Sequence, residues 1–399
     1  MSSSSAPPPA SSPSSSPLLA VVTGGNGFLG WHLVSALLAS PSRWRVRVFD
    51  VRPPREARPG VEYATGDLRR DADVAAALAG ADVVLHAATA APTAANSLDK
   101  GLMEAVNVQG TERVLRLARE AGARAVVYTS SASVVFAGRP LRGVDESTPY
   151  ADPPADRYTE TKIQGERLVL EEGRAFVQQQ SSREGAPGSA AEPRASASSP
   201  APHIPALALR PSGIFGEHDA LAVPEIARNA AAGKLRFVLG DGKNLADWTY
   251  AGNVADAHVL AAEALLDPAR RARVSGRAFF VTNDDPRPFW AFMGDVVEGL
   301  GYPRPARHIP ALPVYLVALL IHYVIAPLLK PFFELKSDFT PFRVLLSTTD
   351  RVFSCEAAKK ELGYAPKVPL DQAIQRALAF YPQLHKGADQ QAEGAKKHA

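Results

Sequence analysis

Residues 18–40, LLAVVTGGNGFLGWHLVSALLAS, decide the fold. An apolar run that ends at Thr23 leads into closely spaced glycines, and apolar residues at helical spacing follow. This order predicts a buried strand, a glycine-rich turn and a helix. Such a turn lets the backbone approach a pyrophosphate, while the helix N-terminus offers free N–H donors. We therefore expect a dinucleotide-binding loop with contacts from Gly24, Gly27, Phe28, Leu29 and Gly30.

Further apolar runs alternate with helical stretches along the first half of the chain. They cover residues 45–49, 82–86, 125–129 and 206–209. Strands that alternate with helices predict an α/β fold with a doubly wound parallel sheet, the Rossmann fold. We expect residues 18–211 to form this NAD(P)-binding domain and residues 212–383 to form a smaller C-terminal lobe that binds the substrate.

Three segments are expected to be disordered. Residues 1–17 are dominated by Ser, Pro and Ala, which cannot build a packed core, and they lack the pattern of a secretory signal. Residues 173–204 contain turn formers and small residues without periodicity, so we expect an insertion that is dispensable for chemistry. Residues 384–399 are expected to form a tail.

The composition excludes several classes of function. With 399 residues and 46% hydrophobic side chains, the chain can bury a large core. Its net charge is only +3, from 44 basic and 41 acidic residues, so we expect no nucleic-acid partner. Cys355 is the single cysteine, which excludes an intrachain disulfide and a thiolate metal cluster. We expect no metal site. The single cysteine also fits a protein that lies in a reducing compartment facing the cytosol.

One segment, residues 310–329, contains no formally charged side chain. Its length just suffices to span a bilayer, but three prolines shorten the uninterrupted helix. An interfacial or re-entrant membrane element, a buried core helix and a true span all stay open. Flanking basic and aromatic residues favour the interface, so we expect residues 310–333 to associate with a membrane; these residues are Lys330, Lys336, Tyr315, Tyr323, Phe332 and Phe333.

Other candidate cofactor contacts follow the next strands. Asp50 lies 20 residues past Gly30, where a carboxylate binds the ribose hydroxyls and repels a 2′-phosphate, so NAD is favoured. Arg52 could pair with that phosphate, which keeps NADP as an alternative. The remaining candidates come after the third and fourth strands: Asp67, Leu68, His86, Ala87 and Ala88. Asp67 could instead be a helix cap, and a histidine at a strand end is more often structural.

The catalytic prediction rests on Tyr158 and Lys162, four residues apart and hence on one face of a helix. An adjacent cation together with the nicotinamide charge would stabilise the Tyr158 phenolate near neutral pH, which makes it a general base. Ser131, at the end of the strand AVVYTSS, would hold the substrate hydroxyl. Tyr158 and Lys162 are also candidate cofactor contacts.

At this point the chain resembles the extended short-chain dehydrogenases, and among them the 3β-hydroxysteroid dehydrogenase group. The resemblance spans about residues 18–383 without the insertion, and its most specific motifs are VFDVRPP (48–54), YTSSASVVF (128–136), RYTETK (157–162), ALRPSGIFG (208–216), DWTYAGNVADAHVLAAEALLDP (247–268), FFVTND (279–284) and TPFRV (340–344). It implies Ser131, Tyr158 and Lys162 as the catalytic set. It further implies that Asn107 supports the lysine, often through water, and that Pro211 lies beside the nicotinamide.

The resemblance is strongest to fungal members that act on 4α-carboxysterols. It implies oxidation of the 3β-hydroxyl to a ketone with loss of the C4 carboxylate as CO2, in the C4 demethylation of ergosterol biosynthesis. It also implies the cytosolic face of the endoplasmic reticulum membrane, with a C4-methyl oxidase, a 3-keto reductase and a scaffold protein as partners, and a homodimer. The alternatives are a 3β-hydroxysteroid dehydrogenase/isomerase, another extended dehydrogenase or epimerase of secondary metabolism, and a catalytically inactive NAD-sensing protein.

Overall fold

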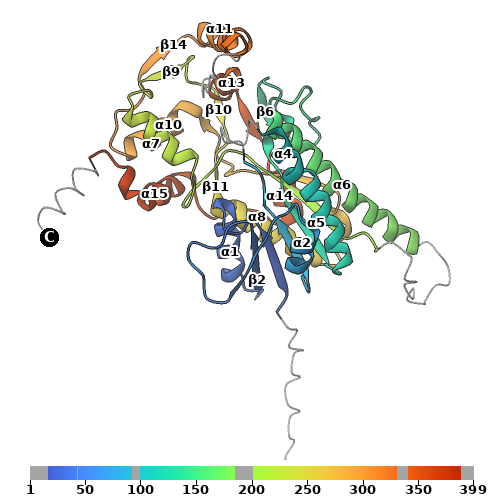
Figure 1. Cartoon of the computed structure of the whole chain (residues 1–399). Helices are drawn as coiled ribbons and strands as arrows, with labels where there is room; N and C mark the ends of the chain where they lie inside the picture. The colour runs from blue at the N-terminus through green and yellow to red at the C-terminus, as the bar shows by residue number, and fades with distance from the viewer. Residues whose placement is uncertain (1–16, 43, 92–98, 185–200, 330–339, 388–399) are drawn as a thin grey trace, which may run out of the picture.

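The computed structural model describes residues 17–42, 44–91, 99–184, 201–329 and 340–387. Its centre is a sheet of seven parallel strands in the order β12-β7-β5-β4-β1-β2-β3 (Figure 1). The strands are β1 (Leu19–Thr23), β2 (Arg45–Asp50), β3 (Val61–Thr65), β4 (Val83–His86), β5 (Ala125–Thr129), β7 (Ala206–Pro211) and β12 (Ala278–Val281). The predicted doubly wound fold is confirmed, and each apolar run named from the sequence forms a strand at or within two residues of its expected bounds.

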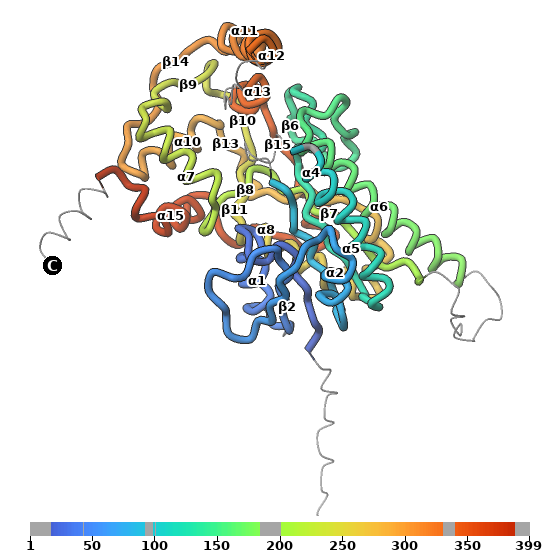
Figure 2. The backbone as a smooth tube through the Cα atoms, in the orientation of Figure 1, coloured from blue at the N-terminus to red at the C-terminus, as the bar shows by residue number. Residues whose placement is uncertain are grey.

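Helices cover both faces of this sheet because successive strand residues point to opposite sides. Ala20 and Val22 pack on the face covered by α1 (Phe28–Ala39), α8 (Ala251–Leu266) and α14 (Glu356–Leu362). Leu19 and Val21 pack on the other face. That face is covered by α2 (Asp71–Leu78), α5 (Gln109–Glu120) and α6 (Arg157–Glu184), with α4 (Lys100–Asn107) alongside (Figure 2).

Residues 212–383 do not all belong to the lobe, although the chain does leave the sheet at residue 211. After β7 the chain enters the C-terminal lobe, returns to the central sheet with α8 and β12, and then enters the lobe again. β12 pairs in parallel with β7, and the buried side of α8 belongs to the same core as β1. Sequence order could not reveal this return, because an apolar strand fits either sheet equally well. The lobe is therefore built from several separate stretches of chain, which also include β6 (Leu141–Val144), a strand that precedes residue 211.

The lobe has its own core and small sheets. Its main helices are α7 (Ala222–Ala231), α10 (Phe289–Gly299), α13 (Pro341–Thr348) and α15 (Leu370–Phe380). One sheet joins β10 (Leu245–Ala246), β13 (Arg287–Pro288), β15 (Arg351–Phe353) and β6 (Leu141–Val144). Two pairs complete the lobe, β8 (Ile214–Phe215) with β11 (Thr249–Tyr250) and β9 (Phe237–Leu239) with β14 (Arg307–Ile309). Three further short elements are the 3-10 turns η1 (Ala132–Val135) and η3 (Pro382–Leu384), and α9 (Arg271–Val274).

The uncharged segment forms one continuous helical run at the far end of the lobe. It consists of α11 (Ala311–Leu320), a π-helical stretch η2 (Ile321–Ile325) and α12 (Ala326–Leu329). Pro313 does not interrupt it, because this residue lies in the first turn, where backbone N–H groups have no helical partner. Pro327 lies in α12, directly after the π-helical stretch. The run is long and apolar enough to cross a membrane by length and composition, and only 6% of its 18-residue window is buried. The alternative of a buried core helix is therefore wrong.

The first residues of the predicted insertion are helical. α6 continues to Glu184, since Gln and Glu favour helix even without an apolar face to bury. Residues 201–204 are docked, because the Glu172 carboxylate accepts hydrogen bonds from the Ile204 N–H (3.0 Å) and contacts His203 Nδ1 (2.9 Å). Residues 1–16, 185–200, 330–339 and 388–399 lie outside the described residues, and with them Lys330, Lys336, Phe332 and Phe333 and most of the predicted tails.

Candidate active site

The glycine loop follows β1 and has the conformation that the sequence predicts. Gly24 has φ +70°, and a Cβ there would lie 2.7 Å from the Ala88 Cα. A Cβ on Gly30 would lie 2.2 Å from the Gly24 carbonyl oxygen, so the third glycine lets α1 pack tightly on the loop. α1, all of whose residues the structure describes, starts at Phe28 with no side-chain cap and no acidic residue in its first turn. Its free N–H groups fit a pyrophosphate.

Asp50 ends β2 beside this loop and is buried. One carboxylate oxygen accepts a hydrogen bond from the Asn26 N–H (3.1 Å) and the other from the Arg52 N–H (3.0 Å). The Asn26 side chain in turn donates to the Arg52 carbonyl (2.7 Å). The carboxylate therefore joins the glycine loop to the segment after β2, and it keeps lone pairs for ribose hydroxyls. The exposed Arg52 is held there through its backbone alone in these contacts.

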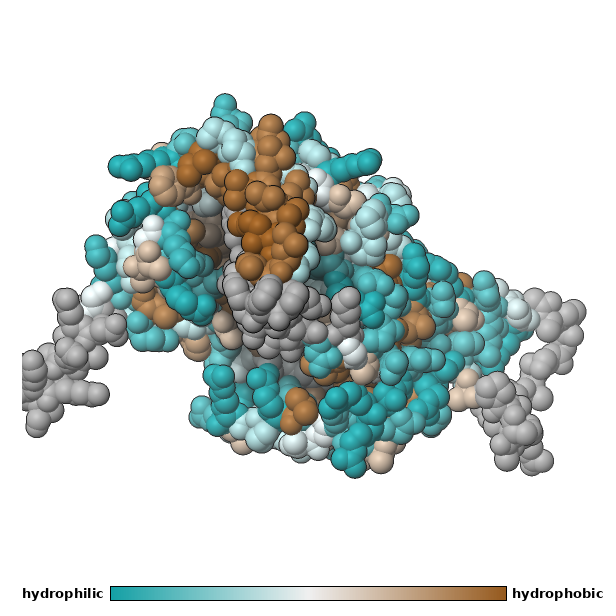
Figure 3. Space-filling view, turned by 45° about the horizontal axis from the view of Figure 1, so that its top comes forward, coloured by the Kyte–Doolittle hydropathy of each residue, from teal (hydrophilic) through white to brown (hydrophobic). Residues whose placement is uncertain are grey.

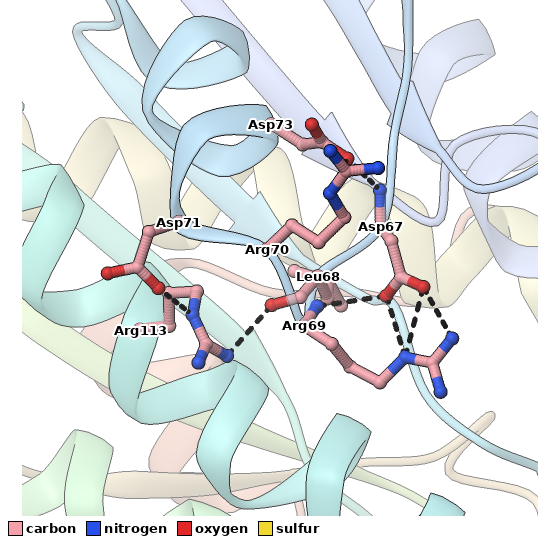
Figure 4. A network of polar contacts seen from close by, with 7 residues as sticks. All are labelled: Asp67, Leu68, Arg69, Arg70, Asp71, Asp73 and Arg113. Atoms are coloured by element: carbon pink, nitrogen blue, oxygen red, sulfur yellow. Dashed lines mark hydrogen bonds and ion pairs between the residues drawn. The ribbon is translucent and has the colours of Figure 1, made fainter.

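Asp67 and Leu68 follow β3, where cofactor contacts were predicted (Figure 4). The Asp67 carboxylate binds Arg69, which lowers the pKa of Asp67. The Asp67 N–H donates to Asp73 Oδ2 (3.0 Å), and the Asp67 carboxylate accepts from the Arg69 N–H (2.9 Å), so both residues stabilise the turn before α2. Leu68 is buried, and its carbonyl accepts a bond from Arg113 (3.0 Å). The Asp67 side chain is therefore engaged within its own loop, and its contact with the cofactor stays a prediction.

His86 is placed differently from a cofactor-contacting side chain. It ends β4 fully buried, with Nδ1 2.7 Å from Thr23 Oγ1 and Nε2 3.1 Å from Thr111 Oγ1. Burial, and secondarily the charge of Lys162, lowers the pKa of His86 to about 3, so the ring is neutral. These contacts support the alternative that His86 has a structural role. Ala87 and Ala88 are half-buried, and the Ala88 N–H donates to Thr23 Oγ1 (3.2 Å).

The structure brings the predicted cofactor and catalytic segments together at one edge of the sheet. β1, β4, β5 and β7 are neighbours in a parallel sheet, so their carboxyl ends meet. These ends carry the glycine loop, Ala87 and Ala88, Ser131, and Pro211, which is buried at the end of β7. Helix α6 crosses beside them and contributes Tyr158 and Lys162.

The Lys162 side chain is buried next to the end of β5. Its Nζ donates to the Thr129 carbonyl (2.7 Å), lies 3.4 Å from the Tyr128 hydroxyl and is 6.0 Å from the centroid of the Tyr158 ring. Burial lowers the pKa of Lys162 to about 7, and the nearby Glu166 carboxylate opposes that shift. The predicted Tyr158–Lys162 pair therefore exists, and Tyr128 is a second aromatic neighbour that the motif did not reveal.

Tyr158 does not have a lowered pKa in the chain alone. Burial, and secondarily the charge of Asp156, raises its pKa above the ordinary value. We expected Lys162 and the positively charged nicotinamide together to stabilise the phenolate. The chain's own groups alone do not lower the pKa of Tyr158. Lys162 contributes less than expected because its ammonium is itself desolvated, so the charge of both partners is disfavoured.

Ser131 and Asn107 are held by short local networks. Ser131 precedes η1, and its Oγ accepts bonds from the Ser133 N–H (3.2 Å) and hydroxyl (2.9 Å). η1 packs against α6, the helix that carries Tyr158 and Lys162. Asn107 Nδ2 donates to Thr161 Oγ1 (3.0 Å), while its Oδ1 accepts from the Ala90 N–H (2.8 Å). Asn107 thus contacts Thr161, the residue before Lys162, directly.

One pair of charges was missed at the sequence level. Glu166 lies one helical turn beyond Lys162, is fully buried and binds Arg210 of β7 through Nη2 (2.6 Å) and Nε (3.1 and 3.2 Å). The Tyr150 hydroxyl also donates to Glu166 (2.7 Å). The i, i+4 spacing of Lys162 and Glu166 was the available signal. This ion pair fastens α6, and with it the catalytic residues, to the sheet.

The comparisons with known proteins agree with this geometry. A family model described as "NAD dependent epimerase/dehydratase family" matches residues 20–272. The chain belongs to this family. Among solved structures of similar fold is the UDP-glucose 4-epimerase of Thermus thermophilus with NAD, with a TM-score of 0.63 and 19% identity over 91% of this chain and 99% of that one. At that identity the likeness concerns the fold, including the C-terminal lobe.

Sequence relatives extend the family resemblance over almost the whole chain. The Mus musculus "Sterol-4-alpha-carboxylate 3-dehydrogenase, decarboxylating" is 38% identical over 92% of this chain and 91% of its own length. The Saccharomyces cerevisiae "Sterol-4-alpha-carboxylate 3-dehydrogenase ERG26, decarboxylating" is 35% identical over 90% and 97%. Relatives that carry this name thus match both the sheet domain and the lobe, which confirms the predicted resemblance.

Proposed function

We propose that the protein oxidises the 3β-hydroxyl of a 4α-carboxysterol to the 3-ketone with NAD, and that the C4 carboxylate leaves as CO2. The observation that carries the proposal is the convergence of Ser131, Tyr158 and Lys162 beside the glycine loop at the carboxyl edge of the sheet. This set suits hydride transfer from a secondary alcohol. The names of relatives that span the whole chain support the sterol and the decarboxylation.

The chain's residues divide the work of the first step. Ser131 Oγ lies where it can hold the substrate hydroxyl, and Tyr158 takes the proton of that hydroxyl as the C3–H bond breaks. Lys162 lies beside the Tyr158 ring and favours its deprotonated form. Bound NAD supplies the acceptor for the hydride and a positive charge that adds to that of Lys162.

Loss of CO2 needs little from the protein. The new C3 ketone is β to the C4 carboxylate, so the C4–carboxylate bond breaks with its electron pair delocalised into the ketone, which gives CO2 and an enolate. Protonation at C4 then gives the 3-ketosterol. The part of the chain that binds the substrate therefore has to align C3 and enclose the apolar ring system.

NAD is proposed over NADP because of the position of the Asp50 carboxylate. The carboxylate is fixed by the Asn26 and Arg52 N–H groups at the end of β2, where it meets ribose hydroxyls and repels a 2′-phosphate. Arg52 leaves NADP as the competing cofactor, and the ratio of the two dissociation constants decides between them.

The apolar run α11–α12 supports a membrane location. Leu312, Leu316 and Leu320 follow one another at i+4 and are 67, 55 and 50% exposed, and Leu328 continues the row at 68%. Figure 3 shows these side chains as an apolar patch on the surface of the lobe. The opposite side of α11 packs on α13, so the helix lies along the lobe. This favours insertion in the plane of the membrane interface over a span.

We place the protein on the cytosolic face of the endoplasmic reticulum membrane, where a membrane-borne sterol reaches the lobe directly. The single cysteine, Cys355, is free and buried, in keeping with a reducing compartment. The proposed partners are a C4-methyl oxidase, which produces the carboxylate, a 3-keto reductase, which consumes the ketone, and a scaffold protein; a homodimer is also proposed. Cross-linking of the full chain in microsomes tests these contacts.

Vesicle flotation tests the membrane surface. Leu316→Glu with Leu320→Glu should abolish flotation with phospholipid vesicles, while Leu38→Glu, at an exposed leucine of α1, should leave it intact. Flotation that persists in the double variant would contradict an interface made by α11. Carbonate extraction of the native membrane then separates the two modes, because only a spanning helix resists it.

Substrate selectivity tests the reaction. Purified protein with NAD should form NADH from a 4α-carboxy-3β-hydroxysterol in detergent, and Tyr158→Phe should not. Equal rates with a 3β-hydroxysteroid that lacks the carboxylate would instead indicate a general 3β-hydroxysteroid dehydrogenase.

A further inference from the structure

His258 is a buried histidine that the proposed reaction does not use. It lies on α8, on the face of the sheet opposite to α6, and is fully buried. Its Nδ1 is 2.8 Å from the Val254 carbonyl oxygen, one turn earlier in the same helix. Its Nε2 is 2.7 Å from Thr129 Oγ1. Both ring nitrogens are therefore engaged.

These contacts determine the tautomer of the ring. A carbonyl oxygen only accepts, so Nδ1 carries the proton and Nε2 offers a lone pair. The Thr129 hydroxyl must then donate to Nε2. Burial lowers the pKa of His258 to about 4, so this neutral form persists across the physiological range. The side chain of Thr129 is thus held in one rotamer by a fixed acceptor.

Thr129 links this histidine to the catalytic lysine. It is the last residue of β5, and its backbone carbonyl accepts the 2.7 Å bond from Lys162 Nζ. We propose that His258 is a positioning residue for Lys162, because it anchors the residue whose carbonyl holds the lysine. The inference rests on the proposed role of Lys162 in dehydrogenation.

The effect of His258 is geometric. The titratable groups near Lys162 are Tyr128 of β5, Tyr158 and Glu166 of α6, and His86 of β4. His258 is neutral and adds no charge to this set. If Thr129 shifts, Lys162 loses an acceptor that stabilises its ammonium form, and its support of the Tyr158 phenolate weakens. The acid limb of the kcat profile then moves to higher pH.

Thr129→Val tests the link, because it removes the hydroxyl and keeps the shape and the carbonyl. We expect kcat to fall by up to about 100-fold, the acid limb to move to higher pH and NADH to bind more weakly by fluorescence titration. Thr129→Ser, which keeps the hydroxyl, should restore most of all three. The control is Thr282→Val at the end of β12, where the buried hydroxyl accepts a bond from the Asp284 N–H (3.0 Å).

The outcomes separate positioning from a merely structural role. Both valine variants should lose thermal stability, but only Thr129→Val should change the pH profile and NADH affinity. If Thr129→Val matches the control in both readouts, the proposal is wrong. Should Thr129→Val not fold, His258→Leu removes the same bond and decides the question by the same readouts. A wild type that binds NADH but oxidises no sterol would contradict the proposed function, while the NADH affinities would still test the positioning.

Discussion

The buried pair of Glu166 and Arg210 gives the sharpest prediction about stability. The two side chains are 0 and 4% exposed and share three hydrogen bonds, and the Tyr150 hydroxyl adds a fourth to Glu166. Glu166→Gln keeps the shape but removes the negative charge. It leaves the Arg210 guanidinium buried without a counter-charge, which costs several times more than loss of an exposed ion pair.

The expected loss is about 3–5 kcal/mol in the free energy of unfolding. Replacement of both partners by apolar residues, Glu166→Leu with Arg210→Met, should cost much less than the two single changes combined, because no charge stays buried. Urea unfolding followed by tryptophan fluorescence measures the wild type, Glu166→Gln, the double variant and its two single variants. The reasoning fails if Glu166→Gln costs less than about 1 kcal/mol, or if the double variant loses as much as the single variants together.

The same change has a catalytic consequence. Glu166 raises the pKa of Lys162, which burial otherwise lowers to about 7. Without that carboxylate the lysine should lose its proton at lower pH, so activity should depend more strongly on pH near neutrality. Glu120→Gln, at an exposed acidic residue of α5, is the matched control and should change neither stability nor pH dependence.

Four further predictions concern other parts of the chain. Tyr158→Phe should abolish NADH formation while NADH binding and thermal stability stay close to wild type; near-full turnover would exclude the assigned base. Asp50→Ala should weaken NADH binding more than NADPH binding, as isothermal titration would show, and equal losses would contradict the ribose assignment. Burial raises the pKa of Asp247 to about 7, so the folded chain binds a proton there that the unfolded chain releases above about pH 4. The stability that this group contributes is present at low pH and is lost as the pH rises to about 7. Asp247→Asn should therefore be more stable than wild type at pH 8, by at most about 4 kcal/mol. A wild type with equal urea midpoints at pH 5 and pH 8 would contradict this. Deletion of residues 185–200 should leave turnover intact, and loss of activity in a folded deletion variant would show that the insertion contributes to the site.

Local sequence patterns predicted the first half of the fold well. The glycine loop, β2, β4 and β5 follow from apolar runs and from the special backbone that Gly24 adopts. The same reasoning failed for β12, because periodicity does not say which sheet a strand joins. It also placed the end of α6 too early, since the residues after Glu172 show no apolar periodicity although they continue the helix.

The site was predicted where chemistry depends on residue type, and missed where it depends on packing. Tyr158 and Lys162 share a helix face, as their spacing indicates. His86 could not be assigned from sequence, because only the fold shows that Thr23 and Thr111 occupy both of its nitrogens. His258 has no motif that points to Lys162, since their link runs through Thr129 and across the sheet.

The ratio of CO2 to NADH tests the central claim most directly. Purified protein with NAD and a 3β-hydroxysterol labelled at its 4α-carboxylate carbon should release labelled CO2 and form NADH in a one-to-one ratio, and a 3β-hydroxysteroid without the carboxylate should give little of either. NADH formed from both substrates without release of label would contradict the decarboxylating dehydrogenase and leave only a general hydroxysteroid oxidation.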